Sequence, residues 1–258
     1  MSTYYFATAG KSAVGLVRAG NEDSALTSKS LIAVADGMGG HAGGEVASYV
    51  AITTLRDLAP SFAHNDIDSD SADDLFAAAV EEIDKTLAWT ATERPELSGL
   101  GTTLSALLLH GETVAMAHIG DSRIYRLRGN SIEQLTKDQT VIQQLLDSGS
   151  ITLDEVANHP QRSVLTHVLM GDGKALSGLT IYDVKPQDRF ILCSDGLSNV
   201  LTEKEIKALV KDKARTFAVD ALIEATYSKG APDNVTVIVA EILENDIQEK
   251  LTTYGAAQ

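Results

Sequence analysis

The sequence predicts an α+β fold that forms one domain over residues 1–258. Segments with strand patterns alternate with segments of helical periodicity, and many of the strands are joined by short turns. No linker, repeat or low-complexity tract divides the chain. Hydrophobic residues make up 44% and charged residues 22% of the sequence, proportions typical of a globular protein, which exclude disorder throughout. A chain of 258 residues is long for one domain, but sheet sandwiches often reach this size.

The N-terminal part predicts strands and then two helices. The strands are expected at residues 4–8, 12–17 and 30–35, and the helices at 44–58 and 72–92. The third strand is a nearly continuous apolar run that ends at Asp36 and Gly37, a pair typical of turns. In the second helix, apolar residues recur at the spacing of one helix face.

The middle of the chain predicts a meander of antiparallel strands. Four strands are expected, at residues 102–109, 113–119, 123–128 and 131–135, with turn residues between them. The apolar stretch from 103 to 120 contains His110, Gly111 and Glu112. A hairpin therefore explains it better than a membrane span, which would bury charge at its middle.

Residues 138–176 predict a flap over the core. An amphipathic turn near residue 141 precedes a polar stretch with weak periodicity and one proline, as is typical of functional loops. The remaining elements are expected as strands at 179–184, 189–193 and 234–242 and as helices at 203–210 and 216–228.

The charge balance limits the class of partner. The chain has 36 acidic and 21 basic residues, a net charge of −15, which repels a nucleic-acid backbone. Cys193 is the only cysteine, and the N-terminal residues lack the pattern of a signal peptide. We therefore expect a cytoplasmic protein with no nucleic-acid partner and no membrane span in this chain.

A calcium loop of the EF-hand type is one alternative for the acidic stretch at Asp66, Asp68 and Asp70, because alternate carboxylates begin such a loop. Its required glycine and glutamate are replaced by Ser71 and Ala77. The stretch is therefore interpreted as a solvated acidic loop.

A dinucleotide-binding turn is a second alternative, because residues 37–42 fit the pattern G-x-G-x-x-A between a strand and a helix. Asp36 would place a negative charge beside a pyrophosphate. The following helix leads into an acidic loop instead of a second parallel strand. A nucleotide-dependent oxidoreductase is therefore the weaker hypothesis.

Four aspartates give the strongest chemical signal. Each lies at the edge of a predicted strand beside a small or turn-forming residue: Asp36, Asp121, Asp195 and Asp233. If the sheets bring these strand ends together, mutual repulsion raises the carboxyl pKa values unless cations neutralise them. Oxygen ligands select Mg²⁺ or Mn²⁺, whereas the histidines of this chain lack the spacing of a helical zinc pair. Gly37 has no side chain, so its carbonyl can approach an ion closely.

The order of several short motifs resembles the metal-dependent protein serine/threonine phosphatases of type 2C. The motifs are Arg18-Ala-Gly-Asn-Glu-Asp23, Asp36-Gly-Met-Gly-Gly-His41, Gly101-Thr-Thr103, Gly120-Asp-Ser-Arg123, Ser194-Asp-Gly-Leu197 and Asp233-Asn234. In the flap, the motifs that resemble the bacterial branch are His159-Pro-Gln-Arg162 and Val164-Leu-Thr166. The resemblance covers nearly the whole chain. It implies a four-layer α-β-β-α sandwich, in which two mostly antiparallel sheets pack face to face between helices.

The resemblance also implies a metal centre at one end of the sheets. Two Mn²⁺ or Mg²⁺ ions would be held by Asp36, the Gly37 carbonyl, Asp195 and Asp233. Asp36 would bridge the two ions, while Glu22 and Asp23 would act mainly through bound waters. Asp121 would join Asp195 in holding a third, weaker ion, assisted by Ser163 in the flap.

The implied reaction is the hydrolysis of phosphoserine and phosphothreonine in proteins. A hydroxide that bridges the two ions would attack phosphorus in line, without a phosphoenzyme. Arg18 would bind the phosphate, because a planar guanidinium can grip two of its oxygens. The leaving alkoxide needs a proton. Met38 stands where eukaryotic relatives have a histidine, which leaves His41 or a metal-bound water as the proton donor.

The implied setting is a bacterial Ser/Thr kinase system, in which a monomer would act on phosphorylated proteins, including the kinases and their substrates. A pseudophosphatase that keeps the fold as a binding module is a rival hypothesis. The intact residues Asp36, Asp195, Asp233 and Arg18 argue against it. Metal-dependent turnover of p-nitrophenyl phosphate separates these two hypotheses, and a thermal shift with NAD tests the oxidoreductase.

Overall fold

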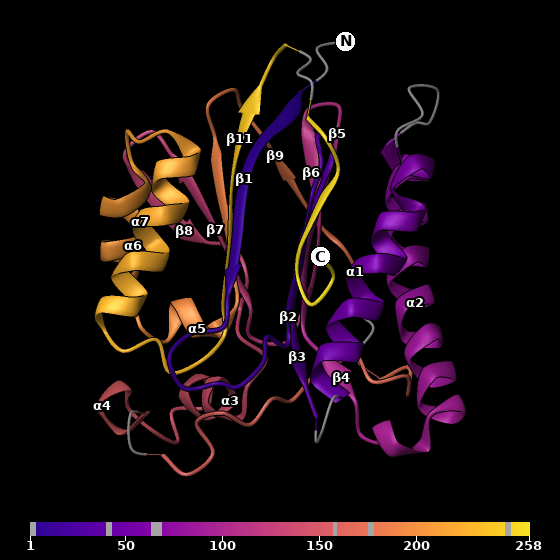
Figure 1. Cartoon of the computed structure of the whole chain (residues 1–258). Helices are drawn as coiled ribbons and strands as arrows, with labels where there is room; N and C mark the ends of the chain where they lie inside the picture. The colour runs from indigo at the N-terminus through magenta and orange to yellow at the C-terminus, as the bar shows by residue number, and fades with distance from the viewer. Residues whose placement is uncertain (1–3, 40–42, 63–68, 157–158, 175–177, 246–248) are drawn as a thin grey trace.

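Two antiparallel sheets packed face to face form the centre of the protein, and helices cover both outer faces (Figure 1). The computed structural model describes residues 4–39, 43–62, 69–156, 159–174, 178–245 and 249–258. The arrangement is the α-β-β-α sandwich that the motifs imply.

The first sheet has the strand order β1-β11-β10-β7-β8, and each neighbouring pair is antiparallel. Its strands are β1 (Tyr5–Ala13), β7 (Arg123–Arg128), β8 (Ser131–Gln134), β10 (Arg189–Cys193) and β11 (Val235–Leu243). The helices on its outer face are α5 (Asp195–Ser198), α6 (Glu203–Val210) and α7 (Arg215–Ser228). A capping box between Thr202 and Glu205 begins α6.

The second sheet has the order β12-β2-β3-β5-β6-β9, and the short strand β4 pairs with β3. Its strands are β2 (Asp23–Thr27), β3 (Leu31–Met38), β4 (Gly101–Thr102), β5 (Leu104–His110), β6 (Thr113–Ile119), β9 (Thr180–Asp183) and β12 (Thr252–Gly255). Two long helices cover it, α1 (Gly43–Phe62) and α2 (Ser69–Glu93), and a 3-10 helix, η1 (Pro95–Leu97), leads back to the sheet.

Apolar side chains fill the three spaces between the four layers. In β3, Leu31 and Ala33 pack toward α1 and α2, whereas Ile32 and Val34 pack toward the first sheet. Successive side chains of a strand point to opposite faces. Because both faces of β3 are buried, its sequence is a continuous apolar run instead of an alternating one.

The predicted flap lies at one end of the sandwich, below both sheets in Figure 1. Its helical parts are α3 (Val141–Asp147) and the single turn α4 (Leu153–Val156). Thr140 caps α3, because its side-chain oxygen accepts a hydrogen bond from the Gln143 amide at 3.1 Å. The flap therefore starts from a defined helix end next to the sheets.

Several strand predictions are wrong at the two ends of the chain. The strands expected at 4–8 and 12–17 are the single strand β1, and residues 14–17 lie beyond it. Gly10 lies between the two predicted strands, and β1 continues through it; a side chain there would lie 2.9 Å from the Tyr254 ring. The strands β2 and β12 were not predicted; β2 is fully buried although it begins with Asp23 and Ser24.

The fold also bears on the predicted hairpin, on the dinucleotide-binding turn and on the calcium loop. Residues 103–120 contain the predicted β5–β6 hairpin, and no helix in the described ranges has the length and apolar character that a membrane crossing requires. β3 is antiparallel to its neighbours β2, β4 and β5, unlike the parallel strands of a dinucleotide-binding fold. Asp66 and Asp68 of the acidic stretch lie outside the described residues.

Candidate active site

A cavity of about 270 Å³ opens where the ends of both sheets meet the flap. Its lining consists of Arg18, Glu22, Asp36, Gly37, Met38, Gly39, Thr103, Asp121, Ser163, Leu165, Asp195 and Asp233. Most of the site residues expected from the motifs are therefore brought together. Asp23 is buried next to the cavity, and His41 lies outside the described residues.

Asp36 and Asp23 are direct neighbours on the paired strands β3 and β2. The Asp23 carboxylate is almost fully buried and accepts a hydrogen bond from Ser194 Oγ at 2.7 Å. The Asp36 amide donates to Thr103 Oγ1 at 3.0 Å, and the Asp36 carbonyl accepts from the Thr102 hydroxyl at 3.0 Å. These bonds fix the backbone of Asp36 near the end of β3.

Two glycines allow three backbone segments to meet beside Asp36. A side chain at Gly37 would lie 2.0 Å from the Gly44 carbonyl oxygen and 2.5 Å from that of Glu22. A side chain at Gly44 would lie 2.8 Å from the Glu22 carboxylate. Gly37 was expected to let its carbonyl approach an ion. The structure adds that the first turn of α1 needs the same space.

Asp195 and Asp233 come from the first sheet. Asp195 is the first residue of α5, separated from β10 by Ser194 alone, and accepts a hydrogen bond from the Asn199 side chain at 3.1 Å. Asp233 precedes β11 and accepts from the Asn234 amide at 2.9 Å. A side chain at Gly196 would lie 1.9 Å from the Asn234 carbonyl oxygen. This glycine therefore permits the two acidic segments to touch.

Arg18 and Asp233 form a bidentate ion pair. Arg18 Nε lies 2.7 Å from Asp233 Oδ1, and Nη2 donates to Oδ2 at 2.8 Å. The hydrogen bond to Asp233 raises the pKa of Arg18, so the guanidinium keeps its charge. The Arg18 side chain is 51% exposed and that of Asp233 is 33% exposed, which places the pair at the rim of the cavity.

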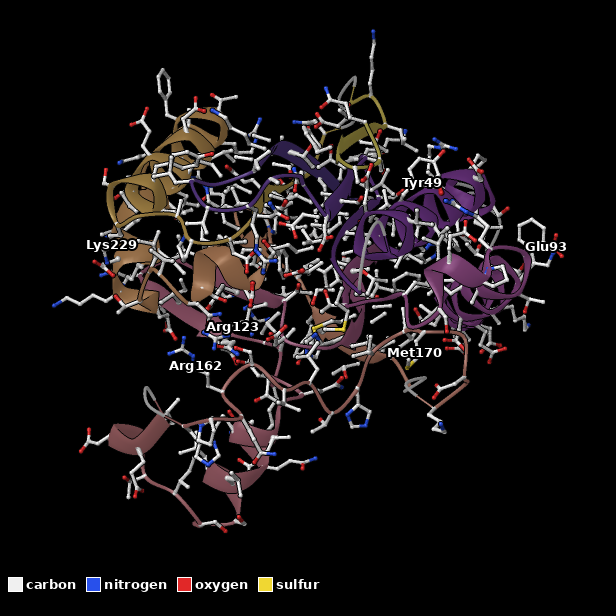
Figure 2. All side chains as sticks on the ribbon, turned by 60° about the horizontal axis from the view of Figure 1, so that its bottom comes forward. Tyr49, Glu93, Arg123, Arg162, Met170 and Lys229 are labelled. Carbon is white, nitrogen blue, oxygen red and sulfur yellow. The ribbon has the colours of Figure 1, made fainter. Side chains whose placement is uncertain are left out.

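Asp121 and Ser163 form the side of the cavity nearest the flap. Both also line a second cavity of about 300 Å³ beneath the flap. Arg123 contributes to this second cavity and is held by Asp138, with its Nη2 2.6 Å from Asp138 Oδ2. Figure 2 shows Arg123 and Arg162 near each other on this side of the molecule. Asp121 thus lies between the sheet and the flap.

The clustered carboxyl groups affect one another's ionisation. Burial, followed by the charges of Asp23 and Asp195, raises the pKa of Asp36 well above its ordinary value. Burial is also the main cause that raises the pKa of Asp23 to about 7 and that of Asp121 to about 7. For Asp195, burial and then the charge of Asp233 raise the pKa. Full ionisation of the cluster therefore calls for additional positive charge.

The donor chemistry of the cavity fits a hard divalent cation. Among the described residues, its lining offers carboxylate and carbonyl oxygens and neither histidine nor cysteine, a ligand set suited to Mg²⁺ or Mn²⁺. Within the same ranges, however, no group of three His, Cys, Asp or Glu side chains is already arranged to hold a metal ion. The pairing of Asp233 gives one reason, because both of its carboxylate oxygens contact Arg18. The Arg18 guanidinium thus offsets the negative charge of Asp233, which a bound metal ion would otherwise offset.

Asn234 has a positioning role that the sequence reasoning missed. Its side-chain amide donates to the carbonyls of Val14 and Gly20 at 2.9 and 2.8 Å, and its side-chain oxygen accepts from the Glu22 amide at 2.8 Å. It therefore ties the loop that carries Arg18 to the start of β11. The Asp-Asn pair was visible in the sequence, but its partners lie more than two hundred positions away.

The comparisons with known proteins agree on one family. The family model described as "Protein phosphatase 2C" matches residues 20–229. The "Serine/threonine protein phosphatase PstP" of Mycobacterium tuberculosis is 42% identical over 241 residues, which cover 92% of this chain and 45% of that protein. This chain therefore spans about half the length of that relative. The "Serine/threonine phosphatase stp" of Listeria monocytogenes is 32% identical over 243 residues, covering 92% of this chain and 94% of that one.

A solved structure extends the similarity to three dimensions. The catalytic domain of the serine/threonine phosphatase PstP, solved in complex with two manganese ions, matches with a TM-score of 0.85. It is 38% identical, and the match covers 93% of this chain and 100% of that one. The paired sheets and their flanking helices thus have a counterpart of known structure.

Proposed function

Since this chain belongs to the protein phosphatase 2C family, we propose that it is a metal-dependent protein serine/threonine phosphatase. The observation that carries the proposal is the single cavity that unites Arg18 with Asp36, Asp195 and Asp233. Hydrolysis of a phosphomonoester by this route needs a cation that grips the phosphate beside oxygen ligands for metal ions. The cavity provides both in one place.

Two Mn²⁺ or Mg²⁺ ions would be held by Asp36, the Gly37 carbonyl, Asp195 and Asp233, with Asp36 shared between them. When bound, such ions supply a nucleophile at neutral pH and offset the charge of the phosphoryl oxygens. The two manganese ions of the PstP structure support this number. Glu22 and Asp23 would contribute mainly through water, and the hydrogen bond that Ser194 Oγ donates to the Asp23 carboxylate would orient it for that task.

Arg18 would bind the substrate phosphate. A planar guanidinium can form the same bidentate contact with a phosphate as with a carboxylate, so Arg18 can exchange Asp233 for the substrate. Its partly exposed position at the rim leaves the guanidinium accessible to a phosphorylated side chain. There it would also stabilise the charge of the transition state.

The flap side would support a third, weaker ion through Asp121 and Asp195, with Ser163 assisting. These three residues line the same cavity. The leaving alkoxide needs a proton, and Met38, which lines the cavity, has none to give. Our candidates for the donor are His41, outside the described residues, and water.

The proposed setting is the cytoplasm, where a monomer would oppose Ser/Thr kinases by acting on phosphorylated proteins. The buried, unpaired thiol of Cys193 suits a reducing compartment. The net charge of −15 disfavours nucleic acid as a partner.

Phosphate release from a phosphothreonine peptide tests the proposal. We expect turnover of this peptide and of p-nitrophenyl phosphate with Mn²⁺ or Mg²⁺, and none after chelation by EDTA. Asp220→Asn is a suitable control, because Asp220 forms an exposed ion pair with Lys11 away from the cavity. A folded protein that binds Mn²⁺ but releases no phosphate from either compound would instead be a pseudophosphatase.

A further inference from the structure

The last part of the flap, which we call the returning arm (residues 163–174), is attached to helix α2. Asp84 of α2 is 5% exposed and accepts two backbone hydrogen bonds from the arm. The Gly171 amide donates to Asp84 Oδ1 at 2.8 Å, and the Gly173 amide donates to Oδ2 at 2.8 Å. Each carboxylate oxygen thus holds one amide, a charge-assisted arrangement in a buried place.

The arm fits closely against the helix at this point. Gly171 has a φ of +83° and Gly173 a φ of +70°, conformations that favour glycine. A side chain at Gly171 would lie 2.4 Å from the Ala88 amide nitrogen of α2, whereas a side chain at Gly173 would meet open space. Gly171 is therefore needed for contact, and Gly173 only for backbone conformation.

A short series of bonds leads from this attachment to the cavity. The fully buried Leu169 exchanges backbone hydrogen bonds with Thr102, at 2.9 and 3.0 Å. The Thr102 hydroxyl in turn donates to the Asp36 carbonyl. A few residues before Leu169, Ser163 and Leu165 line the cavity. Figure 2 shows Arg162 on the Arg123 side and Met170 on the side of α1 and α2, so the arm crosses the molecule between them.

We propose that Asp84 is a positioning residue that holds the returning arm, and with it Ser163 and Leu165, at the edge of the active site. The inference rests on the proposed phosphatase function. Asp84 touches neither the cavity nor the reacting groups, so its effect would pass through the arm alone. Because Ser163 and Leu165 of the arm line the edge of the cavity, we expect the arm to contact the substrate residues that flank the phosphate. Phosphoproteins should then depend on Asp84 more than a small phosphate ester does.

The test compares Asp84→Ala with Asp188→Ala. Asp188 is the control, because it is 1% exposed and its carboxylate also accepts a loop amide, that of Lys185 at 2.8 Å. It lies directly before β10, away from the cavity, and also forms an ion pair with Arg128. For Asp84→Ala we expect kcat/KM for a phosphothreonine peptide to fall about tenfold, mainly through KM, since misplacement of binding groups has effects of this order. Turnover of p-nitrophenyl phosphate should stay within about threefold of wild type. The control should lose thermal stability without changing the ratio of the two activities.

Hydrogen exchange gives a readout that does not need catalysis. Amides of the returning arm should exchange faster in Asp84→Ala and not in Asp188→Ala. Gly171→Ala should reproduce both effects with Asp84 intact, because it pushes the arm off α2. Gly111→Ala is its control, because Gly111 also has a positive φ and open space around it but lies in the turn between β5 and β6. Gly171→Ala therefore tests the proposal even if Asp84→Ala does not fold. Unchanged arm exchange, or an unchanged ratio of peptide to p-nitrophenyl phosphate activity, would overturn the proposal. A wild type inactive on both compounds would instead refute the phosphatase function.

Discussion

The two halves of the candidate site are built in different ways. The sheet half carries Asp36 and Asp23 on paired strands, surrounded by buried side chains and backbone hydrogen bonds. The flap half carries Ser163 on an exposed segment, which contacts the core through separate backbone bonds such as that from the Leu169 amide to the Thr102 carbonyl at 3.0 Å. Metal ligands need fixed positions, whereas contacts with varied protein substrates tolerate adjustment. Substitutions can therefore alter the chemistry of the site and its fit to the substrate separately.

The largest effect should come from breaking the sheet half at Asp36. Asp36→Asn should lower Mn²⁺-dependent turnover of a phosphopeptide at least about 10³-fold, because it removes the charge of the ligand shared by both ions. Asp233→Asn should act in the same direction. The fold should persist, as circular dichroism would show. Wild-type rates in either variant at saturating Mn²⁺ would disprove the assignment of the metal ligands.

A smaller loss of activity is expected from a change at Arg18, at the rim of the cavity. Arg18→Ala should reduce kcat/KM by roughly 10 to 150-fold, the loss of one charge-assisted contact worth about 1.5 to 3 kcal/mol. The same variant leaves Asp233 without its guanidinium partner, so calorimetry should also show tighter Mn²⁺ binding. An unchanged kcat/KM would exclude Arg18 from phosphate binding. Lys11→Ala, which breaks an exposed ion pair elsewhere, serves as the control.

Asp121 tests the boundary between the two halves. Asp121→Ala should lower activity about fivefold to tenfold and increase the Mn²⁺ concentration needed for saturation, since a weakly held ion loses one of its two carboxylates. A metal titration of activity beside a thermal melt checks this. If Asp121 only shapes the turn between β6 and β7, the melting temperature will fall while the Mn²⁺ activation curve stays the same.

The smallest effect concerns stability without metal. The pKa of Asp23 and that of Asp121 are raised from 3.8 to about 7, so the folded protein holds protons that the unfolded chain has released. The resulting stabilisation is complete below pH 4 and is lost as the pH rises through about 7. In EDTA, the melting temperature should therefore fall by at least about 3 °C between pH 5 and pH 8.

Saturating Mn²⁺ provides the control for this pH dependence. Ions in the cavity would offset the carboxylate charges, so the fall in melting temperature should shrink or vanish. Asp121→Asn in EDTA should show a shallower fall than wild type. A melting temperature in EDTA that rises over this pH range would contradict the raised pKa values.

Sequence patterns predicted those parts of the fold that depend on interactions between residues close in sequence. The apolar run of β3, the β5–β6 hairpin and the acidic residues at strand ends follow from neighbours in sequence, and the fold places them as expected. β2 escaped prediction because Asp23 and Ser24 are polar yet buried, held by Ser194 and Ser48 from distant segments. β1 was predicted as two strands, and the contact that Gly10 permits between them, with the Tyr254 ring, involves a residue far along the sequence.

The same distinction applies to the site. Motif order predicted which acidic residues would be ligands, but the ion pair of Arg18 with Asp233 and the hydrogen bond between Asp84 and Gly171 join residues far apart in sequence. No spacing rule reports such pairs, because they depend on how complete layers pack. The resemblance to a family supplied roles for single residues, while the geometry supplied the connections between them.

The position of β11 between β1 and β10 affects how the protein is made. β1 pairs with β11 along its whole length, although the two strands stand near opposite ends of the sequence. During translation, β1 leaves the ribosome long before its partner exists, and Asp233 and Asn234 emerge just ahead of β11. A nascent chain therefore cannot close its first sheet or assemble the proposed catalytic centre until that segment is free of the exit tunnel. Shorter polypeptides lack this centre, so cellular phosphoproteins would meet it only in chains whose synthesis has passed β11.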